Sequence, residues 1–115
     1  MDNNWTKRLS GLALSLVSAN ALAEQTACPE SFLDIPVYYQ ASHCQVFADA
    51  PPASMSYHAK TDMQQAMAFY QSKLGEASHQ DLKRGRHILE FKNGDHILIF
   101  SEDGPGTQVD ILVKQ

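Results

Sequence analysis

Histidine is the residue best suited to chemistry in this chain, as a metal ligand or a general base, and the sequence holds five. His87 and His96 flank Asn93-Gly94, the strongest short signal for a two-residue β-hairpin. In the register set by that turn, the two imidazoles share a face but lie about 13 Å apart, at ~3.3 Å per residue. His79 or Asp81 could approach His87, but a shift of one residue at the preceding turn would move them to the other face. The spacing therefore predicts no metal site.

Serine and carboxylate residues offer two further chemistries. Ser54 and Ser56 lie near His58 in the sequence, but neither a nucleophile elbow nor an oxyanion-hole turn accompanies them. Glu102 and Asp103 stand in a glycine-containing loop, where solvated turn residues are expected rather than catalytic carboxylates. We therefore expect no catalytic residues, no cofactor and no enzyme activity.

Cys28 and Cys44 are the two cysteines of the chain. In an exported protein an even number of cysteines favours a disulfide. This bond would close a loop of about 17 residues and stabilise the fold by ~3 kcal/mol in the chain-entropy model. The alternatives are a pair of metal ligands, for which the spacing gives no signature, or two free thiols. A lipid anchor at Cys28 is a weaker alternative, because Gln25 stands where such signals usually have Leu.

The first 23 residues have the pattern of a secretory signal peptide. A charged start at Lys7 and Arg8 precedes an apolar run, and Ala21-Leu22-Ala23 fits an A-x-A cleavage site. The apolar run of about 15 residues is shorter than the ~20 needed to span a membrane. We therefore expect residues 1–23 to be removed and residues 24–115 to form a single domain in the periplasm or outside the cell.

Charge excludes two classes of partner. Without the predicted signal peptide, the chain has twelve acidic and seven basic residues, a net charge of −5. Nucleic acids and anionic membranes bind basic surfaces, and the basic cluster of Lys83, Arg84 and Arg86 lies at a predicted turn. We expect no nucleic-acid partner and no stable membrane insertion once the signal is removed.

The chain is organised around the hairpin of residues 86–101. Asn93-Gly94 tolerates the positive φ that a type I′ turn needs at both central positions. The turn pairs Phe91 with His96 and continues the ladder to Ile88 opposite Ile99. Both faces are partly apolar, so both need covering, which one helix cannot do. One face carries His87, Leu89, Phe91, His96, Leu98 and Phe100, and the other carries Ile88, Glu90, Lys92, Asp95, Ile97 and Ile99.

One helix is predicted between Thr61 and Gly75. Thr61 or Asp62 fits a capping box, and Gly75 supplies the left-handed position after the helix. The apolar stripe of this helix is Met63, Ala66, Met67, Tyr70 and Leu74. Further extended segments are expected at residues 32–39, 45–47, 54–60, 77–82 and 107–113. The layout predicts an α+β fold, an antiparallel sheet of four or five strands with one amphipathic helix packed across it.

The segment Asp34-Ile-Pro-Val-Tyr38, together with the helical Ala68-Phe-Tyr-Gln-Ser-Lys-Leu74, resembles a loose, largely uncharacterised group of small exported bacterial proteins. That group shows an Ile/Leu-Pro-x-Tyr leading segment, a Phe-Tyr-x3-Leu helix and a terminal β-meander. The resemblance covers most of residues 34–113. It implies export and an α+β fold, and it transfers no catalytic residue. Where many of these proteins have Pro-Gly after the Tyr, this chain has Tyr39-Gln40.

These observations favour a small, non-enzymatic binding protein that acts through a sheet face or edge. After the helix covers one face, the other is either closed by residues 28–47 as a lid or left open to a protein partner or a second copy in a homodimer. The alternative function is a small ligand or metal carrier that uses the histidine-bearing face. The candidate partner-binding residues are Leu89, Phe91, His96, Leu98 and Phe100.

Overall fold

A computed structural model describes residues 27–115, and the predicted signal peptide at residues 1–23 lies outside them. The described residues form an α+β fold with one α-helix, a six-stranded antiparallel sheet and a two-stranded ribbon. The α+β prediction is confirmed. The prediction of four or five strands was wrong, because a full strand forms at residues 41–48 where only a short extended piece at 45–47 was expected.

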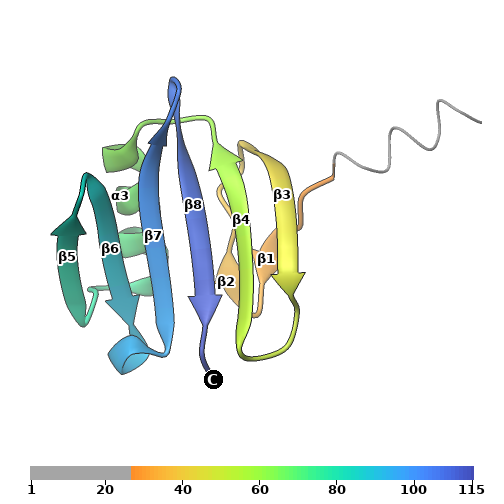
Figure 1. Ribbon diagram of the computed structural model, residues 1–115, viewed down its shortest axis with the longest axis vertical. Coiled ribbons are helices and arrows are strands. Elements are labelled where there is room, and N and C mark those ends of the chain that lie inside the picture. Colours follow the sequence, from red (N-terminus) through yellow and green to blue (C-terminus); the bar gives the residue numbers. More distant parts are fainter. Residues whose placement is uncertain (1–26) are drawn as a thin grey trace, which may run out of the picture.

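In chain order the elements are β1 (Ser31–Phe32), β2 (Ile35–Pro36), β3 (Ala41–Ala48), β4 (Ala53–Ala59), α3 (Met63–Leu74), β5 (His79–Lys83), β6 (Arg86–Phe91), the 3₁₀ turn η2 (Lys92–Gly94), β7 (His96–Asp103) and β8 (Gly106–Val113). All strand pairs are antiparallel, and paired strands follow one another along the chain except for β4 and β8. The large sheet has the order β3-β4-β8-β7-β6-β5, so β3 and β5 are its edges (Figure 1).

The predicted hairpin register between β6 and β7 is confirmed. Residues 87–91 pair with residues 96–100 in the expected antiparallel order. Asn93 and Gly94 have φ of 56° and 93°, the positive values that a type I′ turn requires. A 3.1 Å hydrogen bond from the next backbone N–H to the Lys92 carbonyl closes the turn.

The helix α3 begins and ends where the sequence predicts. The Asp62 side chain accepts a hydrogen bond of 2.8 Å from the backbone N–H of Gln65. Gly75 follows the last turn with φ of 87°, and its N–H donates to the Gln71 carbonyl. No helix among residues 27–115 is long and apolar enough to cross a membrane. The residues that α3 buries are Ala66, Met67 and Tyr70.

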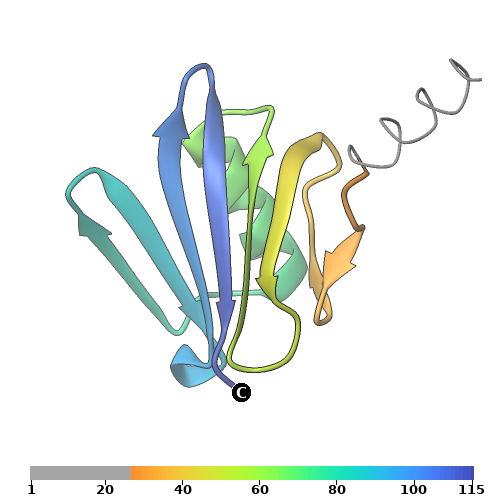
Figure 2. The same cartoon turned by 45° about the vertical axis from the view of Figure 1, so that its right-hand side comes forward.

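The helix packs on the aromatic face of the hairpin, and the β1–β2 ribbon lies on the same side of the sheet (Figures 1 and 2). The segment 32–39, expected as one extended piece, is folded back at Leu33 and Asp34, which both have positive φ. Its apolar side chains Phe32, Ile35 and Val37 join the core beside the helix. They do not form a lid over the opposite face, and the described chain leaves that face uncovered.

Candidate functional site

The predicted partner-binding residues lie mostly in the core. Leu89, Leu98 and Phe100 are fully buried, and Phe91 is nearly so. Because α3 packs over this face, a partner cannot reach these four side chains while the domain is folded. His96, at the end of β7, is half-buried. Its partial burial, reinforced by the nearby Lys92 ammonium, lowers the pKa of His96 below its ordinary value.

No element of residues 27–115 packs over the opposite face of the sheet (Figure 1). This face carries an aliphatic block. The block consists of Ile88 on β6, Ile97 and Ile99 on β7, and Leu112 on β8. Ile88 pairs with Ile99 and Ile97 pairs with Leu112, so the four side chains are contiguous across three neighbouring strands. All four side chains are half-buried.

Charged side chains border the aliphatic block. Glu90 pairs with Ile97, and Asp81 and Asp110 extend the row that holds Ile88 and Ile99. An ion pair of 3.8 Å links Asp81 to Lys83. The Asp110 carboxylate accepts a hydrogen bond from the side-chain amide of Gln108. In the described part of the chain, neither Asp110 nor Glu90 has a salt-bridge partner. Two carboxylates that have no salt-bridge partner among residues 27–115 therefore stand at the rim of the block.

The two edges of the sheet are exposed as well, and each has a feature that discourages pairing with another strand. On β3 the exposed fraction of Phe47 is 63%, but the pairing with β4 shifts twice along this strand. On β5 the exposed fraction of Leu82 is 60%, with Asp81 and Lys83 as its neighbours. Bulges and charges are the usual protection of sheet edges against strand addition.

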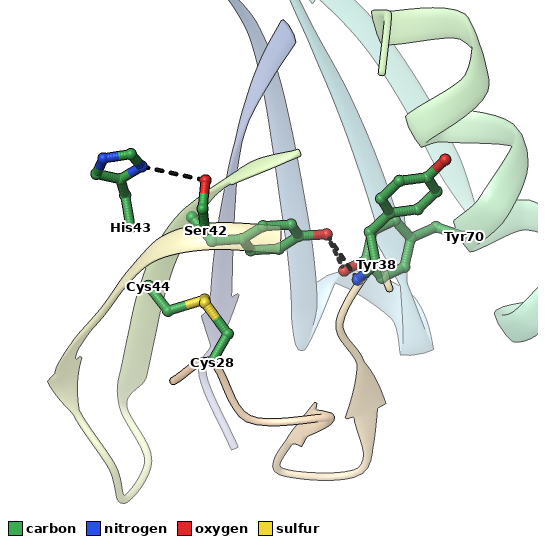
Figure 3. Close-up of a disulfide and its surroundings, with 7 residues drawn as sticks. Cys28, Tyr38, Ser42, His43, Cys44 and Tyr70 are labelled. Atoms are coloured by element: carbon green, nitrogen blue, oxygen red, sulfur yellow. Dashed lines mark hydrogen bonds between the residues drawn. A yellow bond between two sulfur atoms is a disulfide. The ribbon is translucent and has the colours of Figure 1, made fainter. Parts of the chain in front are cut away.

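The first irregularity of β3 also settles which way its polar residues face. One extra residue stands between Ser42 and Gln45 relative to β4, and the backbone at His43 is left-handed with φ of 55°. Such bulges redirect side chains. Cys44 turns toward the core, where it forms the predicted disulfide with Cys28, while His43 lies on the other side of the strand (Figure 3).

His43 thereby joins a polar hollow of about 560 Å³ on the uncovered face, near the β7–β8 turn. Its central contact is a 2.8 Å hydrogen bond from His58 Nδ1 to Asp103 Oδ2. The ring centres of His43 and His58 are 6.3 Å apart, edge to face. His43 Nδ1 lies 3.1 Å from Ser42 Oγ. The residues that line this polar hollow are His43, Gln45, Ser56, Tyr57, His58, Asp103, Gly104, Pro105 and Gln108.

Gly106 allows the His58 ring to take this position. A Cβ atom at Gly106 would lie 2.5 Å from His58 Cε1, 2.6 Å from His58 Nε2 and 2.5 Å from the Ala59 carbonyl oxygen. Real Cβ atoms do not approach heavy atoms so closely, because packed interiors are near their maximal density. The imidazole of His58 therefore rests over a residue without a side chain and is held at its other edge by Asp103.

The sequence did not reveal this cluster. From the sequence, His58 was considered only beside Ser54 and Ser56, and Asp103 only as a loop residue, because the two are 45 positions apart and nothing local links them. The histidines weighed for a metal site do not converge, since His87 and His96 lie at opposite ends of the hairpin ladder. Asp81 faces the other side of the sheet from His87. Within residues 27–115 no group of three or more His, Cys, Asp or Glu is arranged to hold a metal ion.

Comparison with protein-family models, curated proteins and solved structures finds no match. The described chain itself offers two surfaces with defined chemistry, the aliphatic block and the polar hollow. Both lie on the uncovered face of the same sheet, the block over β6, β7 and β8 and the hollow toward β3 and β4. The first is suited to another protein surface and the second to a small polar ligand or an ion.

Proposed function

We propose that this protein is an exported, non-enzymatic binding protein whose uncovered sheet face docks another protein. The aliphatic block at the centre of that face is the observation that most supports the proposal. Protein interfaces combine an apolar, desolvated centre with a polar rim, and the block with its bordering carboxylates has this composition. A face of this kind gains free energy when a partner removes its apolar side chains from water.

The charge of the rim indicates the kind of partner. Glu90 and Asp110 stand beside the block without cationic partners in the described chain, and the predicted mature domain has a net charge of −5. Complementary charge steers association and penalises partners of like charge. We expect a partner with an apolar centre and basic residues opposite Glu90 and Asp110.

The face supports this proposal better than either edge does. Strand addition needs a regular, unprotected edge, whereas β3 is bulged and β5 is charged. The face instead presents four aliphatic side chains on three paired strands, in a regular ladder. A regular ladder holds its side chains in fixed positions, which lowers the entropic cost of binding.

Adjacent residues of β7 provide the experiment. Ile99→Asp places a charge in the aliphatic block, and Leu98→Asp places one in the core. Gln80→Asp is the matched control, because it adds the same charge on an exposed edge residue away from the block. We expect Leu98→Asp to unfold the domain. Ile99→Asp should keep the wild-type circular dichroism spectrum but lose the partner that wild type and Gln80→Asp retain in periplasmic cross-linking.

Light scattering on the same variants identifies a homodimer. If the partner is a second copy, the wild-type protein and Gln80→Asp have the dimer mass, and Ile99→Asp has the monomer mass. Identical cross-linked products and identical masses for all folded variants would show that the aliphatic block is not an interface.

Export has its own test. The proposal requires that the precursor be cleaved after Ala23 and that the domain reside in an oxidising compartment, where disulfides persist. Intact-mass measurement of protein from the periplasm should show a chain that begins at Glu24 and is two hydrogens lighter than its reduced form. A soluble product that retains Met1 would contradict cleavage.

A further inference from the structure

We infer that His43 and His58 form a binding site for a late first-row divalent metal ion, such as Zn²⁺, Cu²⁺ or Ni²⁺, through their Nε2 atoms. The site is independent of the docking function proposed above. Imidazole nitrogen is the ligand that these ions share, whereas Mg²⁺ and Ca²⁺ prefer oxygen. With two protein ligands and an open hollow, the site holds an exchangeable ion whose remaining positions are filled by water.

The hydrogen bonds of the two imidazoles favour ligation through Nε2. In metal sites the ring nitrogen that does not bind the ion usually donates to a carboxylate or another oxygen, which fixes the tautomer and the ring orientation. His58 Nδ1 is bonded to Asp103 Oδ2 at 2.8 Å, and His43 Nδ1 lies 3.1 Å from Ser42 Oγ. Each histidine therefore has its Nδ1 engaged by an oxygen.

The distance between the rings requires one histidine to move. Two imidazoles that share a tetrahedral ion have ring centres roughly 5 Å apart, given metal–nitrogen bonds of ~2.0–2.1 Å. The observed separation of 6.3 Å is about 1 Å longer. His58 is held between Asp103 and Gly106, but His43 is exposed and its ring bonds only to Ser42 among the described side chains. Rotation of His43 toward His58 closes the gap, and a tilt of the His58 ring about its bond to Asp103 turns Nε2 away from Gly106.

The charge of the polar hollow favours a cation. Its lining contains Asp103 and no lysine or arginine. Two uncharged side chains, Gln45 and Gln108, also line the hollow.

Calorimetry with ZnCl₂ and electron paramagnetic resonance with CuSO₄, both on the purified protein, test the site. We expect a single ion per chain and a Cu²⁺ spectrum with nitrogen coupling. His43→Asn suits the test because Asn tolerates the left-handed backbone, and His58→Gln keeps an amide donor for Asp103. Each should weaken binding about tenfold or more, and Asp103→Asn, which alters the orienting hydrogen bond, should weaken it by about 10–100-fold.

His79→Asn is the matched control, since His79 is exposed on β5, away from the polar hollow. Its affinity should equal that of the wild type, and Ile99→Asp should also bind the ion unchanged. Unaltered Zn²⁺ affinity in His43→Asn, or an equal loss in His79→Asn, would overturn the inference. If His58→Gln lowers the melting temperature of the metal-free protein so far that it is unfolded, His43→Asn decides alone.

Discussion

The hydroxyl oxygens of Tyr57, on β4, and Tyr70, on α3, lie 2.7 Å apart in the core. The Tyr57 oxygen also accepts a hydrogen bond of 3.2 Å from the backbone N–H of Tyr38, so sheet, helix and N-terminal segment meet at one polar contact (Figure 3). Burial raises the pKa of both Tyr57 and Tyr70, so both hydroxyls stay protonated at neutral pH. One O–H therefore donates to the other.

Removing the Tyr57 hydroxyl should destabilise the domain more than removing that of Tyr70. Tyr57→Phe leaves both the Tyr38 N–H and the Tyr70 hydroxyl without their partner, and a buried group left in this way costs about 1–3 kcal/mol. Tyr70→Phe keeps the bond between Tyr57 and Tyr38. Urea unfolding of the two variants measures the difference. A smaller loss for Tyr57→Phe would show that water replaces its hydrogen bonds.

Local signals made much of the fold predictable. Asn93-Gly94 determined the register of β6 and β7, because a type I′ turn fixes which residues oppose each other. Asp62 and Gly75 determined the ends of α3, because helix termini need specific capping groups. In each case the determining residues lie within a few positions of the element they define.

Relationships that depend on distant segments were not predictable. Both faces of the hairpin are apolar, so the sequence could not tell which one α3 would cover, and the candidate partner-binding residues were placed on the covered face. No glycine, asparagine or proline in β3 marks the position of the bulge at His43. Without that bulge His43 and Cys44 would exchange sides, since successive strand residues face opposite ways. The candidate metal site therefore depends on a register shift that period-two patterning cannot show.

The Cys28–Cys44 bond should stabilise the domain through the loop that it closes. The two residues are 16 positions apart, and the chain-entropy model gives ~3 kcal/mol for a loop of that size. Cys28→Ser should lower the free energy of unfolding by about this amount. Dithiothreitol should bring the wild type to the stability of the variant and leave the variant unchanged. Equal stability of oxidised and reduced wild type would show that strain in the native loop cancels the entropic gain.

His96 should make the domain less stable in mild acid. Burial, with help from Lys92, lowers the pKa of His96 from 6.5 in the folded state, while Asp95 acts in the opposite direction. The unfolded chain binds this proton more readily than the folded domain does. The contribution of neutral His96 to the free energy of unfolding is therefore complete above about pH 6.5, and it declines as the pH falls through the lowered pKa. His96→Gln removes this contribution. The stability difference between wild type and His96→Gln should change between about pH 7.5 and about pH 5, with wild type losing more on acidification.

A substitution of Gly106, at the β7–β8 turn, tests whether the lack of a side chain at this position leaves the space that the His58 ring occupies. Gly106→Ala should destabilise the domain by about 1–3 kcal/mol, because the new methyl group would collide with the imidazole and with the Ala59 carbonyl oxygen. The backbone at Gly106 does not have the positive φ found at Gly104, so the cost comes from lack of space. The double variant Gly106→Ala/His58→Ala separates the two collisions. It should recover part of the stability relative to the sum of the single variants, since the ring can be removed but the carbonyl cannot. Full additivity in urea unfolding would mean that the ring moves away at no cost, and that Asp103 does not hold it in place.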